Sequence, residues 1–514
     1  MKRLFLFAIG GTGARVVRSL TMMLAAGVDG LDSSYEIVPL IIDYDLSNGD
    51  KARAVETLKS YVSIHNTLYP NSVQRQNGTA NYADHFFMTG MSPLPSNDAE
   101  HPYEFFFGPQ TTEKFTQYLR KSTLNTNPAT ALTESLLEAL YDTSDDMSKD
   151  AELELDMAKG FKGNPNIGAV VFHELKNSPE YQRFAGTFNP SDDKIFIISS
   201  IFGGTGASGF PELVNAMRSD TQHTTLRTAT IGAALILPYF KLQPFDPDKG
   251  DVGAIEAAAF NAKTRAALGY YATSNGINSK VNAIYYVGDE NQDDYEYAEG
   301  EVRQKNKAHI VEAVAATAII DFLKNNRNHG AYEFSVKDAK LESSIYLTDF
   351  DNTTYSLVLD NLSEFAIAMK YYRDVICGDR RRIDSDVAFY NTFDLSNQIG
   401  RGVWAEIDNF LLSSAGNQWG FYAWLNELRD HVHSIDLYRM DKSKDITHIF
   451  APNEYKVKLW KKNPLSDKEI SSILNQHSNN VPQPTNSLFM KVLRDVSKLI
   501  YKNLQPSNFK PLNN

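Results

Sequence analysis

Two stretches of the chain place a glycine-rich turn between a strand-like run and a helix-like run, and they constrain the fold more than any other feature. In the first, RLFLFAI at 3–9 is followed by GGTGA at 10–14 and then by RVVRSLTMMLAAG. In the second, KIFIISS at 194–200 precedes FGGTGASG at 202–209 and another helix-like run. Glycine lets the main chain come close to a phosphate, and the N-terminus of the following helix offers free N–H groups. The pair predicts an α/β sheet that binds phosphate at its edge.

Further strands are predicted over 35–45, 226–240 and 281–289, with helix-like runs between them. Strands that alternate with helices at this spacing predict a parallel sheet covered on both faces. The region from about 47 to 150 mixes aromatic, turn-forming and acidic residues, and it is expected to be an insertion of loops and short helices.

The two glycine turns alone leave several phosphate-binding folds open. Neither turn has the lysine of the GxxxxGK[ST] phosphate loop, so chemistry of that type is not expected. GGTGARVV begins like a dinucleotide-binding fingerprint, but Val16 stands at its third small position. A dinucleotide-binding domain and a plain turn without a ligand both remain possible at this point.

Two more loops change the interpretation: DYD at 43–45, directly after a strand, and GFKGNPNIG at 160–168. In an open parallel sheet such loops meet at the rim where ligands bind. The four loops, in this order, resemble those of the tubulin/FtsZ superfamily of GTPases over roughly residues 1 to 325. DYD is similar to the end of that family's second strand, 160–168 to its γ-phosphate loop, and 202–209 to its GGGTGSG signature. Phe202, Ala207 and Ser208 depart from that signature.

The resemblance implies GTP and Mg²⁺ as ligands. The residues that it assigns to GTP are Gly10, Gly11, Thr12, Gly13, Arg15, Gly163, Asn164, Gly168, Gly203, Gly204, Thr205, Gly206 and Ala207, with Asn306 as the candidate for recognising the base. Arg15 stands where the cell-division branch of the family has an asparagine that contacts the nucleoside. Asn306 has an alternative interpretation as an ordinary residue at a helix N-terminus.

Asp43 and Asp45 are the candidate Mg²⁺ residues, because magnesium prefers carboxylate oxygens and retained waters. The alternative is a pair of acids that caps a strand end. His309 has no cysteine or acid at a metal-binding spacing in the sequence, so no metal is assigned to it.

In this family, acids of a neighbouring subunit orient water against the γ-phosphate. Phosphoryl transfer needs mainly positioning and charge stabilisation, so a placed carboxylate and a metal ion suffice. Asp349 and Asp351, in YLTDFDNTT, are the candidate catalytic residues, although they come later than the family pattern expects. The loop nearer the predicted core helix offers only Glu333. The alternative for the aspartates is a solvent-facing turn.

The predicted fold is therefore α/β: a tubulin/FtsZ-like parallel-sheet nucleotide-binding domain over 1–305, a long core helix over 306–326, and a divergent C-terminal domain over 327–505 that is α+β or mostly helical. Residues 506–514 are expected to be a flexible tail. The predicted function is a GTPase that assembles head to tail into filaments of itself. A GTP-binding switch that does not polymerise is the alternative, and an NAD-dependent oxidoreductase is a third interpretation.

Charge and cysteine content limit which classes of partner and which compartment are expected. The net charge of -12 argues against direct nucleic-acid binding, because phosphate contacts need clustered Lys and Arg. The stretch from 451 to the end has ten Lys or Arg against four Asp or Glu, so an adaptor protein is a possible partner there. One cysteine, Cys377, and the lack of a long apolar run predict a cytoplasmic protein with no membrane insertion.

Overall fold

The computed structural model covers the 514-residue chain. It describes residues 2–28, 35–45, 47–70, 85–95, 100–107, 114–124, 135–136, 139–141, 152–157, 160–161, 163–242, 257–273, 276–289, 293–295, 306–324, 331–333, 344–345, 354–378, 388–412, 419–435, 438, 446, 449, 455–457, 466–479, 481, 483–504 and 509–511.

A seven-stranded sheet forms the centre of the N-terminal part, in the order β3-β2-β1-β4-β5-β7-β9. Its strands are β1 (Lys2–Ile9), β2 (Tyr35–Ile42), β3 (Gly90–Met91), β4 (Lys194–Ser200), β5 (Ile231–Ile236), β7 (Ala283–Val287) and β9 (Ala331–Glu333). Every neighbouring pair is parallel, and Ala8 of β1 pairs with Ile41 of β2 and Ile198 of β4. The predicted parallel sheet is confirmed.

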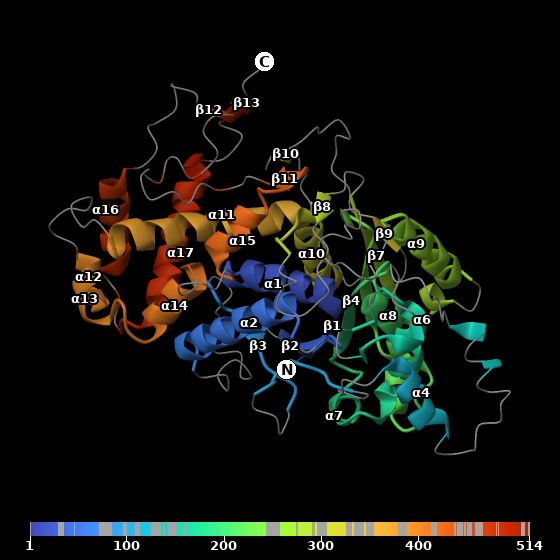
Figure 1. The fold of residues 1–514 in the computed structure, drawn as a ribbon. Helices are drawn as coiled ribbons and strands as arrows, with labels where there is room; N and C mark the ends of the chain where they lie inside the picture. Colours follow the sequence, from blue (N-terminus) through green and yellow to red (C-terminus); the bar gives the residue numbers. More distant parts are fainter. Residues whose placement is uncertain are drawn as a thin grey trace.

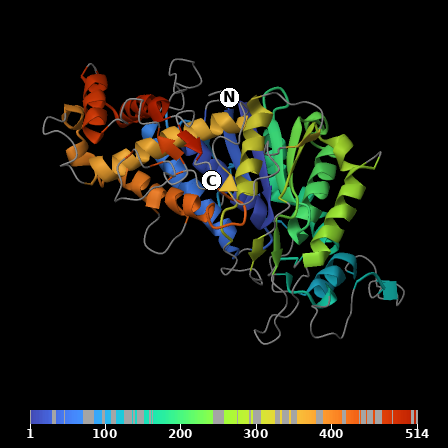
Figure 2. The same ribbon diagram turned by 90° about the horizontal axis from the view of Figure 1, so that it is seen from above.

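Helices cover both faces of this sheet (Figure 2). One face carries α1 (Gly10–Ala25), α2 (Gly49–Leu68) and α10 (Ile310–Lys324), and the other α6 (Pro165–Phe172), α7 (Pro179–Thr187) and α8 (Gly204–Arg218). Side chains alternate between faces along a strand. Accordingly Leu4, Leu6 and Ala8 belong to one buried cluster, and Phe5 and Phe7 to the other.

The strand order reverses between β1 and β4, which lie side by side at the middle of the sheet. The chain runs outward from β1 through β2 to β3, and from β4 through β5 to β7 on the opposite side. Both crossovers connect parallel strands and are right-handed, but they run in opposite directions along the sheet, so α1 and α8 cover opposite faces. Because all strands are parallel, both helices begin at the same edge of the sheet. The two glycine turns therefore meet at the switch point.

The C-terminal part is built mainly of helices in the portion that the structure describes, and it packs beside α1 and α2 (Figure 1). These are α11 (Thr354–Tyr371), extended by a π-helical turn over Tyr372–Ile376, α12 (Ala388–Thr392), α13 (Leu395–Gln398), α14 (Val403–Leu412), α15 (Phe421–Glu427), α16 (Asp467–Ser478) and α17 (Asn486–Leu504). The chain also forms α4 (Phe115–Leu124), α9 (Ala257–Tyr271), β6 (Phe240–Leu242), β8 (Asp293–Tyr295), β10 (Ser344–Ile345), β11 (Ser434–Ile435), β12 (Tyr455–Val457) and β13 (Phe509–Pro511), the last within the expected tail.

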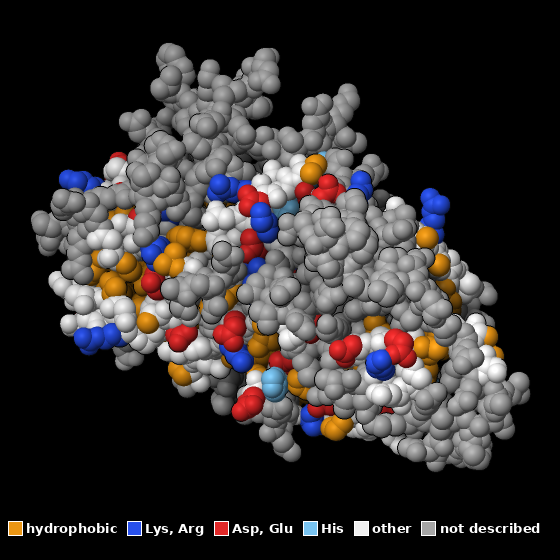
Figure 3. All heavy atoms as spheres, in the orientation of Figure 1, with side chains coloured by type: hydrophobic (Ala, Val, Ile, Leu, Met, Phe, Trp, Pro, Cys, Tyr) orange, Lys and Arg blue, Asp and Glu red, His pale blue; other side chains and the backbone are white. Residues whose placement is uncertain are grey.

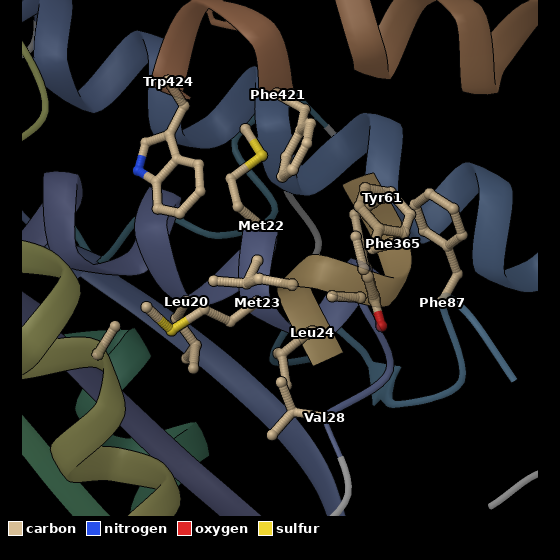
Figure 4. Packing of buried hydrophobic residues seen from close by; sticks show 14 of the residues in the cluster. Leu20, Met22, Met23, Leu24, Val28, Tyr61, Phe87, Phe365, Phe421 and Trp424 are labelled. Carbon is tan, nitrogen blue, oxygen red and sulfur yellow. The ribbon is translucent and has the colours of Figure 1, made fainter. Parts of the chain in front are cut away.

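The two parts share one continuous buried cluster. Figure 4 shows Met22 of α1 beside Phe421 and Trp424 of α15. The Trp424 indole Nε1 donates a hydrogen bond to Ser19 Oγ of α1 at 3.1 Å. Phe365 of α11 contacts Phe421 edge to face, with 5.0 Å between ring centroids. Apolar burial thus holds the C-terminal helices against the sheet domain.

The region from 47 to 150 differs from expectation, because α2 is a 20-residue helix rather than a short one. Its N-terminus is capped by Asn48, whose side chain accepts from the backbone N–H groups of Asp50 and Lys51. Leu58 and Tyr61 are among the buried residues of one helix face. The core helix also begins later than predicted, at Ile310, so Asn306 precedes it.

None of the described helices combines the length and apolar character that a membrane crossing needs. On the face drawn in Figure 3, the described acidic and basic side chains lie interspersed over the surface.

Candidate phosphate-binding site

Three helix N-termini meet at the edge of the sheet where the strand order reverses: those of α1, α8 and α6. A Cβ built on Gly10 would lie 3.6 Å from Thr205 Cβ. A Cβ built on Gly204 would lie 3.0 Å from the backbone nitrogen of Gly163 and 3.2 Å from that of Asn164. The structure therefore brings together the turn after β1, the turn after β4 and the loop before α6.

These three helices begin without a side-chain cap. α1 follows Ile9, α8 follows Gly203 and α6 follows Asn164, with no capping side-chain hydrogen bond and no acidic residue in any of the three first turns. By contrast, Ser178 caps α7 and Ser466 caps α16. The first N–H groups of a helix need a partner, and the helix dipole makes that end attractive to anions. The arrangement suits a ligand with several phosphate groups.

The predicted glycines divide into two groups. Gly10 and Gly163 both have φ of +75°, a conformation that a side chain would strain. Gly13, Gly168 and Gly206 instead permit close packing, since a Cβ on each would come within 2.8 Å of another part of the protein. The atoms in question are the carbonyl carbon of Ala8, Oγ of Ser208 and the carbonyl oxygen of Ser200 respectively. At the positions of the second group, the lack of a side chain lets the helices pack closely against the rest of the protein.

Two of the three departures from the tubulin-like signature, Phe202 and Ser208, have structural explanations. Phe202 is buried, and its ring lies 5.0 Å from that of Phe260 and 5.5 Å from that of Phe240. Ser208 is buried, and its hydroxyl donates to the carbonyl oxygen of Gly204 at 2.8 Å. Ala207 and Thr205 are partly exposed in the first turn of α8. The changes thus leave the main chain of the turn in place.

Asp43 and Asp45 follow β2 and are both buried. Asp43 accepts from the Asp45 backbone N–H at 3.2 Å and from Asn48 Nδ2 at 3.1 Å. Burial raises the pKa of Asp43 to about 7, with Asp45 adding to the rise and Lys51 opposing it. A Cβ on Gly160 would lie 3.9 Å from Asp45 Cβ, so the acids border the loop before α6. Two adjacent buried carboxylates provide the hard oxygen ligands that Mg²⁺ prefers, so the residues fit that ion.

Arg15 is buried beneath the first glycine turn, and each of its three nitrogens has a protein partner. Nη1 donates to Asp50 Oδ2 at 2.5 Å, Nη2 to the Tyr239 hydroxyl at 2.6 Å, and Nε to Glu312 Oε1 at 2.5 Å. Nη2 also lies 3.4 Å from Thr12 Oγ1. This network holds the start of α1 against α2 and α10. The structure therefore places Arg15 as a support for the turn.

Asn306 lies before α10 and is bound to Asp50. Its backbone N–H donates to Asp50 Oδ1 at 3.0 Å, and its side-chain Nδ2 donates to Oδ2 at 3.3 Å. Arg53 donates to the same Asp50 carboxylate at 2.7 Å. Asp50 therefore connects Asn306 to Arg15 and to the phosphate turn.

The sequence interpretation missed Asn48, Asp50, Tyr239 and Glu312. The signal for the first two was the run SNGD, whose asparagine and aspartate favour a helix N-terminus directly after DYD. Tyr239 and Glu312 lie far from Arg15 in the sequence and carried no comparable signal. The candidate catalytic residues Asp349 and Asp351 lie outside the described residues, and Glu333 ends the edge strand β9.

The fold is that of an α/β protein in which three helix N-termini meet at the switch point of a parallel sheet. No protein-family model matches the chain, and no curated protein matches it. Among solved structures, the chain is similar to CetZ from Methanosaeta thermophila strain DSM 6194, at 12% sequence identity and a TM-score of 0.22. The match covers 63% of this chain and 53% of that one, about half its length. The description of the candidate site is therefore drawn from the geometry of this chain alone.

Proposed function

We propose that this chain is a tubulin-like GTP-binding protein that takes up GTP with Mg²⁺ and assembles head to tail into filaments. The observation that carries the proposal is the meeting of three uncapped helix N-termini beside two buried carboxylates. The order of the loops along the chain, which resembles the tubulin/FtsZ order, selects this class. A cytoplasmic setting and an adaptor at the basic C-terminal region belong to the same proposal.

In this proposal the phosphates are bound by the main chain. The backbone N–H groups of 10–13 and 203–206 donate to phosphate oxygens, and the Thr205 hydroxyl adds a donor. Asp43 and Asp45 would hold Mg²⁺, which would supply positive charge beside the phosphates. Asn306, held by Asp50, is the candidate for recognising the base. Hydrolysis requires an acid from the next subunit, for which Asp349 and Asp351 are the candidates.

A GTP-binding switch is the second candidate, and a specific set of contacts favours it. Arg53 donates both to Asp50, beside the site, and to Glu427 at the end of α15, at 2.7 and 3.3 Å. Glu427 also accepts from the backbone N–H of Ala308 at 2.8 Å. The phosphate edge is thus linked to the C-terminal helices through few side chains.

An NAD-dependent oxidoreductase shares this sheet order, since dinucleotide-binding sheets also reverse beside their first strand. Against it stands the N-terminus of α6, which adds a third set of N–H groups at the anion position. Such a site suits a nucleotide triphosphate better than a pyrophosphate bridge.

The test is to mix the full chain with GTP, GDP, a slowly hydrolysed GTP analogue, ATP or NAD, each with Mg²⁺. Calorimetry measures binding, light scattering and electron microscopy detect filaments, and phosphate release reports hydrolysis. Filaments with GTP support the first proposal, and tight GTP binding without assembly supports the switch. Indifference to every nucleotide overturns both, and binding of NAD alone selects the oxidoreductase.

A further inference from the structure

Asp293, His309 and His431 form a cluster that the sequence could not reveal, because each comes from a different segment. Asp293 begins β8, His309 directly precedes α10, and His431 lies beyond the end of α15. His309 Nε2 and His431 Nδ1 each lie 3.1 Å from the same oxygen, Asp293 Oδ2. The three side chains are 11%, 0% and 2% exposed in that order.

The hydrogen bonds fix which ring nitrogen of His431 carries the proton. His431 Nε2 lies 2.9 Å from the carbonyl oxygen of Ala308, which can only accept, so Nε2 is protonated. In the neutral ring, Nδ1 then turns a lone pair toward an oxygen of the Asp293 carboxylate. Two lone pairs at this distance repel each other unless a cation lies between them.

A backbone hydrogen bond orients the Asp293 carboxylate so that one oxygen faces both histidines, where a cation would bind. Its other oxygen, Oδ1, accepts from the backbone N–H of Val432 at 2.7 Å, which orients Oδ2 toward both histidines. His309 accepts at Nδ1 from the backbone N–H of Val311 at 3.1 Å, so its neutral ring carries its proton on Nε2. When a metal ion binds Nε2, the neutral ring takes its other tautomer, with the proton on Nδ1, and the hydrogen bond from Val311 is given up. At His431, the hydrogen bond from Nε2 to the Ala308 carbonyl oxygen is of the kind that fixes ring orientation at metal sites.

The spacing matches a tetrahedral zinc site. Ligands about 2.0 Å from zinc at the tetrahedral angle are separated by about 3.3 Å, close to the two observed separations. The three ligand atoms all lie within 4.8 Å of one another. Two imidazoles and a carboxylate are a ligand set that zinc accepts, with a fourth position for water. The ring of Tyr295 lies 6.4 Å from that of His431, and its buried hydroxyl has no hydrogen-bond partner among the described residues.

We infer that Asp293, His309 and His431 bind one Zn²⁺ ion that fastens β8, the start of α10 and the segment after α15 to one another. The site is separate from the proposed GTP and Mg²⁺ site, and its donors include nitrogen where magnesium prefers oxygen. It joins β8 and the start of α10 to the segment that follows α15.

A neighbouring pair supplies the matched control. His433 follows His431 by two residues in the same segment. Its Nδ1 lies 2.8 Å from both carboxylate oxygens of Asp289. Among the residues that the structure describes, this pair is not part of a group of three metal-ligating side chains. Substituting His433→Gln tests the general effect of losing a histidine from this segment.

The experiment measures metal content by mass spectrometry in the full chain purified without chelator, together with its melting temperature. We expect about one zinc per chain, a lower melting temperature after EDTA, recovery with zinc, and visible d–d absorption when Co²⁺ replaces zinc. His431→Gln keeps an amide N–H for the Ala308 carbonyl, and Asp293→Asn keeps the side-chain shape. Each is expected to lower zinc content at least tenfold, while His433→Gln retains it.

Circular dichroism of each variant checks that it is folded, and Co²⁺ absorption of the wild-type chain gives a readout that needs no variant. Wild-type protein that contains no stoichiometric zinc, shows no Co²⁺ bands and melts alike with zinc and with EDTA overturns the inference. In that case a proton on His431 balances the Asp293 charge. Unchanged zinc in both folded ligand variants overturns it as well.

Discussion

Arg15 of α1 and Glu312 of α10 form a buried ion pair across 297 residues of sequence, with Nε 2.5 Å from Oε1. Burial alone would raise the pKa of Glu312, but Arg15 and Tyr239 lower it below its ordinary value. The carboxylate is therefore charged in the folded protein. This pair fixes the start of α1, and with it the first glycine turn, against the core helix.

Glu312→Gln is expected to lower the free energy of unfolding by about 3 kcal/mol, because removing one partner leaves a buried charge less compensated. Denaturant titration of the metal-free and nucleotide-free chain measures it. Glu180→Gln is the control, since Glu180 pairs with Arg183 near the surface and such pairs contribute at most about 1 kcal/mol. Equal effects of the two substitutions would show that burial of the first pair is unimportant.

Thr205→Asp tests the anion site without harming the helix that carries it. Thr205 is partly exposed in the first turn of α8, where a carboxylate is favourable to the helix dipole. The same carboxylate repels phosphate, so we expect GTP affinity to fall at least 100-fold while the melting temperature stays within a few degrees. Calorimetry and thermal melting measure the two quantities.

Ala405→Asp is the matched control for that substitution, because Ala405 is exposed in the first turn of α14. It adds the same charge to a helix start away from the candidate site. Loss of GTP affinity in both variants, or in neither, contradicts the assignment of the phosphates to α8.

The sheet was predictable because its signals are local. Runs such as KIFIISS are short, apolar and bounded by glycine, and their alternation with helix-like runs fixes a parallel arrangement. The meeting of the loops at 10–14, 43–45, 160–168 and 202–209 follows from a general property of such sheets, and the contacts of Gly10 and Gly204 agree with it.

What the sequence could not supply were pairings that only the tertiary fold creates. Arg15 was assigned to the nucleoside from its place in a motif, yet its partners Asp50, Tyr239 and Glu312 lie on other elements. His309 was left without a metal because its companions Asp293 and His431 are 16 and 122 positions away. Charged and hydrogen-bonding residues that lie this far apart in the sequence form no periodic pattern from which their pairing could be predicted.

The pKa of Asp43 gives a pH dependence with a defined sign. Its folded value of about 7 lies above the ordinary 3.8, so the folded state holds this proton more tightly than the unfolded state. Stability from this group is present below about pH 4 and is lost as the pH rises toward 7. In EDTA, we expect wild-type protein to lose more stability than Asp43→Asn between pH 5 and pH 8.

Thermal melting across that range measures the difference, with Asp192→Asn as an exposed control. Mg²⁺ added at pH 8 is expected to raise the melting temperature of the wild type and to leave that of Asp43→Asn nearly unchanged, since the ion replaces the missing proton. Parallel pH profiles for wild type and Asp43→Asn would contradict the raised pKa.

Glu427 offers the sharpest test of communication between the phosphate edge and the C-terminal helices. It accepts from Arg18 at 2.6 Å, from Arg53 at 3.3 Å and from the Ala308 backbone at 2.8 Å, so it joins α1, α2 and the start of the core helix to α15. If a bound nucleotide orders Asp50, Arg53 connects that change to Glu427, because it donates to both carboxylates. We therefore expect GTP to slow amide hydrogen exchange over 419–435 in the wild type, and to slow it much less in Glu427→Gln.

Asp430→Asn is the control, because its ion pair with Lys307 is exposed and bridges the same segments. If GTP protects α15 equally in Glu427→Gln and in the wild type, the link does not run through Glu427, and packing of α1 against α15 remains to carry the signal.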